Sequence, residues 1–176
     1  MNTSLPTVAF VIFVAIALGS APHESNASKV EGNAFTVVRY PAGKGSHFVT
    51  IADLNGDGNL DIAVANKDSE DVTVLLGDGR GQFHPAPGSP FAAGHCPNDI
   101  AVGDFNGDKK PDLAIVNHDT PYLTLLLGDG QGRFTAAPKS PFTTQSKPHP
   151  HGLAAADFRS SRKARTAPAN SPSRAA

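Results

Sequence analysis

Oxygen-bearing side chains crowd into the nine residues from Asp53 to Asp61, which read DLNGDGNLD. Asp53, Asn55, Asp57, Asn59 and Asp61 stand at alternate positions. Calcium is a hard cation that takes about 6–8 oxygen ligands, and a short loop can supply them when alternate side chains turn inward. The intervening glycines permit a tight backbone turn around such an ion. We therefore predict a Ca²⁺ site in which Asn59 gives its backbone carbonyl and the other four residues give side-chain oxygens.

The same pattern recurs 51 residues later, where residues 104–112 read DFNGDKKPD. The equivalent positions are Asp104, Asn106, Asp108, Lys110 and Asp112, and we predict a second calcium site there. Lys109 replaces a glycine of the first loop, and Lys110 adds another positive charge beside a dication. The second site should therefore bind calcium more weakly than the first.

Two other structures begin with loops of this kind. An EF-hand needs a Glu at its twelfth position and flanking helices, but the twelfth position here is Val64, in an apolar run typical of a strand. Ordinary turns also use Asp and Asn side chains that bond their own backbone. Two copies with the same oxygen positions favour a metal site over turns alone. Since the carboxylates would repel one another without an ion, calcium should contribute to folding.

The repetition extends well beyond the loops. A shift of 51 residues also overlays 75–79 on 126–130 (LLGDG) and 89–91 on 140–142 (SPF), and a third copy begins at 153–158. The first unit holds four short apolar runs, at 48–52, 60–65, 72–76 and 82–84. Runs this short between turn residues indicate strands. Four strands per unit predict an all-β fold, a partial β-propeller with two complete four-stranded blades plus flanking fragments.

Residues 35–158 resemble FG-GAP repeats, also called VCBS repeats, of the kind found in integrin α-subunit propellers and many secreted bacterial proteins. The resemblance rests on the motifs at 53–61 and 104–112 and on the glycine-rich turns that end in Phe83 and Phe134. It implies that the loop residues named above bind calcium. We expect a secreted module for adhesion, scaffolding or carbohydrate recognition, with a glycan or an extracellular protein as partner.

The repeats set the organisation of the chain. We expect a signal peptide at 1–21, an N-terminal segment at 22–46 with a strand near 35–40, repeats at 47–97 and 98–150, a truncated third repeat at 151–158 and a disordered basic tail at 159–176. The apolar run at 8–18 falls short of the roughly 20 residues that span a bilayer, and small residues follow it. An uncleaved anchor or an internal apolar segment is the alternative, because no Lys or Arg precedes the run.

Location and charge follow from this organisation. A cleaved signal predicts a secreted, extracellular or periplasmic protein with no stable membrane span. The whole chain has a formal net charge of −1, although the tail is basic. Because the tail has no aromatic residue and is rich in Ala, Ser and Pro, we expect disorder there rather than nucleic-acid binding.

Two blades cannot close a ring, because propellers usually have about 4–8. An open pair would leave two apolar blade faces in water. Three explanations are open: a truncated or frame-shifted gene product, a module that completes a ring by self-association through its exposed faces, and an open pair of marginal stability. We favour truncation, with self-association second.

The histidines and the single cysteine offer a second place for chemistry. His47, His95, His149 and His151 all precede the first strand of a unit, where propeller loops can converge at a central channel, but exposed loop histidines are the favoured interpretation. Cys96 could join His95 as a metal ligand, although one adjacent pair is weak support and an idle thiol is favoured.

Catalysis has little support in the sequence. No nucleophile-and-base arrangement stands out, and the Gly-Asp-Gly turns are not phosphate loops, because no Gly-Lys-Ser/Thr follows them. The acids outside the loops, such as Glu70, Asp71 and Asp99, form no paired constellation. We therefore expect a protein that is not an enzyme. The alternative function is an accessory part or remnant of a secreted polysaccharide-active hydrolase or lyase.

Overall fold

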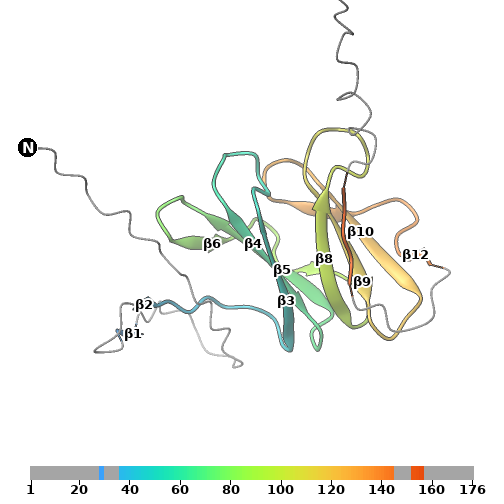
Figure 1. Ribbon diagram of the computed structural model, residues 1–176, viewed down its shortest axis with the longest axis horizontal. Coiled ribbons are helices and arrows are strands. Elements are labelled where there is room, and N and C mark those ends of the chain that lie inside the picture. Colours follow the sequence, from blue (N-terminus) through green and yellow to red (C-terminus); the bar gives the residue numbers. More distant parts are fainter. Residues whose placement is uncertain (1–27, 30–35, 145–151, 157–176) are drawn as a thin grey trace, which may run out of the picture.

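The computed structural model describes residues 28–29, 36–144 and 152–156, and every regular element in these ranges is a strand. A short pair of strands, β1 (Ser28–Lys29) and β2 (Thr36–Val37), comes first. Two antiparallel sheets of five strands follow, one for each sequence repeat. The two sheets form two blades that stand side by side (Figure 1).

The first blade pairs its four main strands in chain order. These are β3 (Ser46–Ala52), β4 (Asp61–Asn66), β5 (Asp71–Gly77) and β6 (Phe83–Pro85), and the short β7 (Phe91–Ala92) pairs with the start of β5. Every residue of β4 is buried, because both faces of this strand are covered. Successive side chains of a strand point to opposite faces, so Ala63 and Ala65 face one side and Ile62 and Val64 the other.

The second blade repeats this topology. Its strands are β8 (Pro97–Gly103), β9 (Asp112–Asn117), β10 (Tyr122–Gly128), β11 (Phe134–Ala136) and β12 (Phe142–Thr143). Both blades carry a register shift at the same place in their first strand. The predicted all-β partial propeller with two four-stranded blades is thus confirmed. The two blades do not close into a ring within the ranges described.

The main apolar core lies between the blades. The first blade contributes small side chains at its centre, such as Ala63, Ala65 and Ala93, and the second contributes larger ones, such as Leu113 and Ile115. Such pairing of small with large residues lets two sheet faces interlock at the packing density of protein interiors.

An aromatic pair joins the outer parts of the two blades. Phe91 of the first blade meets Phe134 of the second edge to face, with ring centroids 5.5 Å apart. The same contact exists one repeat earlier, where Tyr40 meets Phe83 at 5.4 Å, because Tyr40 stands 51 residues before Phe91. The segment before β3 therefore covers part of the outer face of the first blade, packing Val38 and Tyr40 against Ile62, Val64 and Leu75.

The face of the second blade that points away from the first blade is more open. Phe142, at the repeat position of Phe91, is 38% exposed, whereas Phe91 is 8% exposed. Phe105 is 42% exposed, although Leu54 at the same position of the first repeat is fully buried beneath the second blade. On the first blade, Val49 and Ile51 of β3 are also exposed. Apolar surface is therefore present on both blades, as the sequence predicts.

Residues 152–156 run beside the first strand of the second blade. The backbone N–H of Leu153 donates a hydrogen bond of 2.8 Å to Oδ2 of Asp99, a carboxylate that also accepts from the N–H of Ile100. The predicted signal peptide, His149, His151, the end of the third motif and the basic tail lie outside the described residues. Among the residues that are described, no helix is long and apolar enough to cross a membrane.

The aromatic pairs give a matched test of blade packing. Phe91→Ala removes a buried ring from the joint between the blades, so we expect a loss of about 3–5 kcal/mol in the free energy of unfolding. Phe142→Ala changes the equivalent, exposed ring and should cost less than about 1 kcal/mol. Urea unfolding of both variants checks this, and equal losses would contradict the packing described here.

Candidate metal centre

The first acidic loop joins β3 to β4 and is held by its own side chains. Asp53 accepts hydrogen bonds from the backbone N–H groups of Gly56 at Oδ1 (2.7 Å) and Gly58 at Oδ2 (2.9 Å). Both glycines have positive φ, +79° and +85°, a conformation that residues with a Cβ adopt only under strain. The glycines between the acidic positions therefore serve the tight turn that the sequence predicts.

Asn55 and Asp57 lie against each other in the same loop. The Asn55 Nδ2 donates to Oδ2 of Asp57 at 2.9 Å, and the Asp57 N–H donates to Oδ1 of Asn55 at 3.0 Å. The backbone N–H of Asn59 donates to Oδ1 of Asp57 at 2.7 Å, and this bond is the main reason why the pKa of Asp57 lies below its ordinary value. The loop thus keeps Asp57 ionised.

Asp61 has a different position from the other predicted ligands, because it is fully buried at the base of the loop. Its Oδ2 accepts the N–H of Leu54 at 2.7 Å, and its Oδ1 accepts the N–H of Gly77 in β5 at 2.8 Å. Burial raises the pKa of Asp61, while the two backbone donors act in the opposite direction. Asp61 therefore clasps the start of the loop to the middle of the sheet.

Asp112 makes the same clasp in the second blade, with the N–H groups of Phe105 and Gly128, each at 2.9 Å. Sequence reasoning assigned Asp61 and Asp112 as ligands and missed this backbone role. The sequence does contain a sign of it, because an Asp and a Gly recur 16 residues apart in both repeats, as Asp61 with Gly77 and Asp112 with Gly128.

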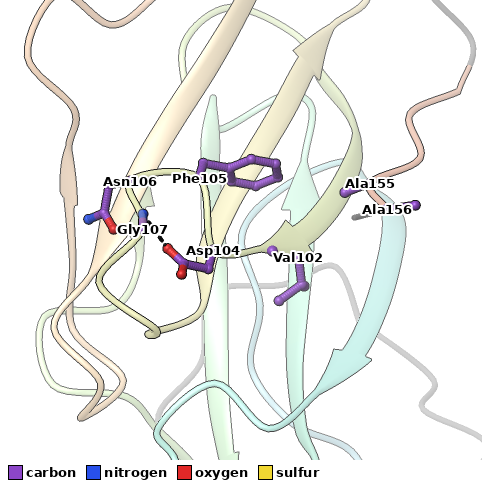
Figure 2. A pocket seen from close by; sticks show the side chains of 8 residues that line it. Val102, Asp104, Phe105, Asn106, Gly107, Ala155 and Ala156 are labelled. Carbon is purple, nitrogen blue, oxygen red and sulfur yellow. Dashed lines mark hydrogen bonds between the residues drawn. The ribbon is translucent and has the colours of Figure 1, made fainter. Parts of the chain in front are cut away.

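The second acidic loop joins β8 to β9 and forms a similar network. Asp104 accepts from Gly107 at 2.6 Å through Oδ1 and from Lys109 at 2.9 Å through Oδ2, and Figure 2 shows its carboxylate turned toward Gly107. Asn106 accepts from the N–H of Asp108 at 2.8 Å. Lys109 stands where the first loop has Gly58 and shares its left-handed backbone, with φ +66°.

A lysine charge distinguishes the second loop electrostatically. The pKa of Asp108 is lowered first by the hydrogen bond from the backbone N–H of Lys110, and the positive charge of Lys110 lowers it further. Asp108 therefore already has a cation near it. No Lys or Arg occurs among residues 53–61, so the first loop has no such internal counter-ion.

The donor sets can be compared with what calcium requires. A carboxylate or amide oxygen has two lone pairs, so an oxygen that accepts one N–H bond, such as Oδ2 of Asp53 or Oδ1 of Asn55, keeps the other available, whereas Oδ1 of Asp53 accepts two. Both loops contain the Asx turns that were the alternative interpretation. Because oxygens in these turns keep free lone pairs, the turns are compatible with a bound ion. The first loop fits Ca²⁺ through side-chain oxygens of Asp53, Asn55 and Asp57, and the Asn59 carbonyl stays a predicted ligand. The second fits less well, because Lys110 competes for Asp108.

A hollow of about 720 Å³ adjoins the second loop (Figure 2). It lies between the loop and Ala155 and Ala156, and the exposed ring of Phe105 forms part of its wall. Its lining comprises Val102, Gly103, Asp104, Phe105, Asn106, Gly107, Ala155 and Ala156.

His47, His95 and the acids Glu70, Asp71 and Asp99 lie at the other end of the blades. His47 lies exposed in β3, at its register shift, while Asn98 at the same repeat position is buried. Asp71 accepts a hydrogen bond of 2.7 Å from Asn66 Nδ2. Cys96 is buried, and this burial raises the pKa of its thiol, which does not suit a nucleophile.

Two antiparallel blades, each with an acidic loop between its first and second strands, define a repeat protein of the β-propeller class. The comparison with protein families agrees with this class. The chain belongs to the FG-GAP-like repeat family, whose model matches residues 53–115 and again residues 104–160. Repeats of this family are typical of extracellular proteins. No curated protein and no solved structure gives a significant match.

Exchanging residues between the loops tests their electrostatic difference. Lys109→Gly/Lys110→Asn gives these two positions of the second loop the residues of the first, and removing two positive charges beside a dication should tighten calcium binding there about tenfold. The reverse change, Gly58→Lys/Asn59→Lys, should weaken the first site to a similar degree. Isothermal titration calorimetry measures both, and calcium affinities that stay the same in the two variants would show that these lysines do not set the ranking.

Proposed function

We propose that the chain is a secreted, calcium-stabilised repeat module for adhesion, scaffolding or carbohydrate recognition. One observation carries the proposal: the same set of acidic and amide oxygens occupies the same loop of both blades, in a family of extracellular repeats. Calcium is abundant outside cells, and its preference for oxygen matches these loops.

Calcium would act on the loops through charge. The first loop places the carboxylates of Asp53 and Asp57 within one short turn. Asp61 lies at its base, with a pKa raised first by burial and further by repulsion from Asp57 and Asp53. A bound dication would offset that repulsion. The chain's own part is to hold the oxygens in place through the N–H donors of Gly56, Gly58 and Asn59. The ion therefore serves stability in this proposal, and recognition falls to other surfaces.

The surfaces for recognition lie beside the second loop and on the open blade face. The hollow next to Asn106 and Phe105 offers amide, carboxylate and aromatic groups together, a combination suited to a sugar ring or a polar peptide. Phe142 adds exposed aromatic surface at the edge of the same blade. A glycan or an extracellular protein is accordingly the proposed partner.

Calorimetry tests the role of calcium in stability. An ion that binds only the folded chain stabilises it by about 2.7 kcal/mol at 100 times its Kd. We therefore expect the unfolding temperature in millimolar Ca²⁺ to exceed that in EDTA, with a smaller effect of Mg²⁺, which demands a stricter octahedral geometry. Asp53→Asn/Asp57→Asn should reduce the difference. The same melting curve in Ca²⁺ and EDTA would refute calcium stabilisation.

A glycan array tests the recognition role. Labelled protein should bind a subset of glycans, and binding should fall when chelator removes calcium and loosens the loops. Phe105→Ala, which truncates an exposed side chain of the second loop, should weaken binding without lowering stability, and His84→Ala serves as an exposed control on β6. Cleavage of any polysaccharide on the array would favour the alternative, a part or remnant of a polysaccharide-active enzyme.

A further inference from the structure

A cluster of metal-binding side chains lies at the opposite end of the second blade from its acidic loop. His95 and Cys96 immediately precede β8, and Asp119 follows the end of β9. One potential ligand atom from each residue lies within 4.8 Å of those from the other two. The three residues come from two separate turns, which the antiparallel pairing of β8 with β9 brings together.

The distance between two of the potential ligands matches that around a tetrahedral ion. The Nε2 of His95 lies 3.4 Å from the Sγ of Cys96. Sulfur at about 2.3 Å and nitrogen at about 2.0 Å from a tetrahedral zinc ion stand about 3.5 Å apart. The imidazole and the thiol are therefore already separated by the distance that two ligands of one ion require.

A carboxylate supports the outer side of the histidine. The Nδ1 of His95 lies 2.6 Å from Oε1 of Glu70, in the turn between β4 and β5 of the first blade. Histidines that bind metals commonly donate their second ring N–H to a carboxylate, which fixes the tautomer and leaves the other nitrogen for the ion. Because Glu70 holds Nδ1, the nitrogen that remains to bind an ion is Nε2, which faces Cys96.

Buried hydrogen bonds hold the turn that carries His95 and Cys96. The Nδ2 of Asn117 donates to the backbone oxygens of Ala93 and His95, both at 2.9 Å, and the N–H of His118 donates to the oxygen of Cys96 at 2.9 Å. Asp119 in turn lies 2.8 Å from Nδ1 of His118 through its Oδ1. The ligands thus stand on a scaffold that is fixed on both sides.

We propose that His95, Cys96 and Asp119 form a binding site for zinc or a similar transition-metal ion, with Glu70 positioning His95 and water completing the coordination. A thiolate, an imidazole and a carboxylate form a mixed set that suits Zn²⁺ or Co²⁺, whereas Ca²⁺ takes oxygen ligands only. The ion binds Cys96 as the thiolate, and the thiol proton passes to solvent. The site is separate from the acidic loops and from calcium.

Cobalt titration of the full, reduced chain in excess Ca²⁺ tests the site. Cys96 is the single cysteine of the sequence, so a thiolate-to-cobalt charge-transfer band reports this position alone. We expect the band to saturate at one Co²⁺ per monomeric chain and to disappear when Zn²⁺ displaces the cobalt. The absence of a band, or a band that requires two chains per ion in sedimentation, would overturn the proposal.

Variants separate a three-ligand site from a thiol that binds cobalt alone. His95→Ala and Asp119→Asn should each weaken cobalt binding more than tenfold, and Glu70→Gln should weaken it about tenfold through the orientation of His95. His84→Ala, which changes an exposed histidine on β6, should leave binding unchanged. Undiminished affinity in both His95→Ala and Asp119→Asn would overturn the site.

The first repeat supplies a variant that preserves the fold. Lys44, Gly45 and Asp68 stand at the positions of His95, Cys96 and Asp119. Gly45 and Cys96 share a left-handed backbone, with φ +65° and +51°, so a glycine is readily accommodated at position 96. His95→Lys/Cys96→Gly should therefore keep the circular dichroism of the parent and abolish zinc binding measured by calorimetry. Retained zinc affinity in this folded variant would place the ion elsewhere and overturn the proposal.

Discussion

Each blade depends on a buried carboxylate that accepts two backbone hydrogen bonds. Asp61 joins the N–H of Leu54, in the acidic loop, to that of Gly77, at the end of β5, and Asp112 repeats the contact. A buried carboxylate is costly unless donors surround it, so the clasp holds only while both strands and the loop keep their places. These two hydrogen bonds attach the start of the acidic loop to the sheet in each blade.

The two faces of each blade carry different side chains, and packing between the blades depends on this difference. One face of a blade is lined by small residues at its centre and by Leu54 and Phe91 at its margins, and the facing surface of the next blade presents Leu113 and Phe134. The Tyr40–Phe83 pair shows that the segment before β3 meets the first blade in the same manner. Because the contact runs head to tail, it can continue from blade to blade, and Phe105 and Phe142 mark the face where the next contact of this kind would form.

Most of the fold and of the acidic loops could be predicted from the sequence, because both follow from local patterns that occur twice. Short apolar runs predicted the strands. The glycines at 56 and 58 have the positive φ that a tight loop requires. The backbone contact of Asp61 was not predicted, since its partner Gly77 is distant in the chain and meets it only across the sheet, and only the recurring spacing of 16 residues points to it. Only part of the cluster around Cys96 could be predicted from the sequence, for the same reason. His95 is its neighbour in sequence, whereas Glu70 and Asp119 reach it through strand pairing.

Comparison of the two repeats separates residues that build the blade from residues free to change. Asn66 and Asn117, with their partners Thr73 and Thr124, keep equivalent buried positions in both blades. By contrast, the turns before the first strands differ, and lysine and glycine in the first become His95 and Cys96 in the second. A cysteine in a left-handed conformation costs stability relative to the glycine that the first repeat places there. Lys109 and Lys139 also adopt left-handed conformations where the first repeat has glycine, so backbone strain alone does not single out position 96. What distinguishes Cys96 is its neighbour His95, whose Nδ1 lies 2.6 Å from Oε1 of Glu70.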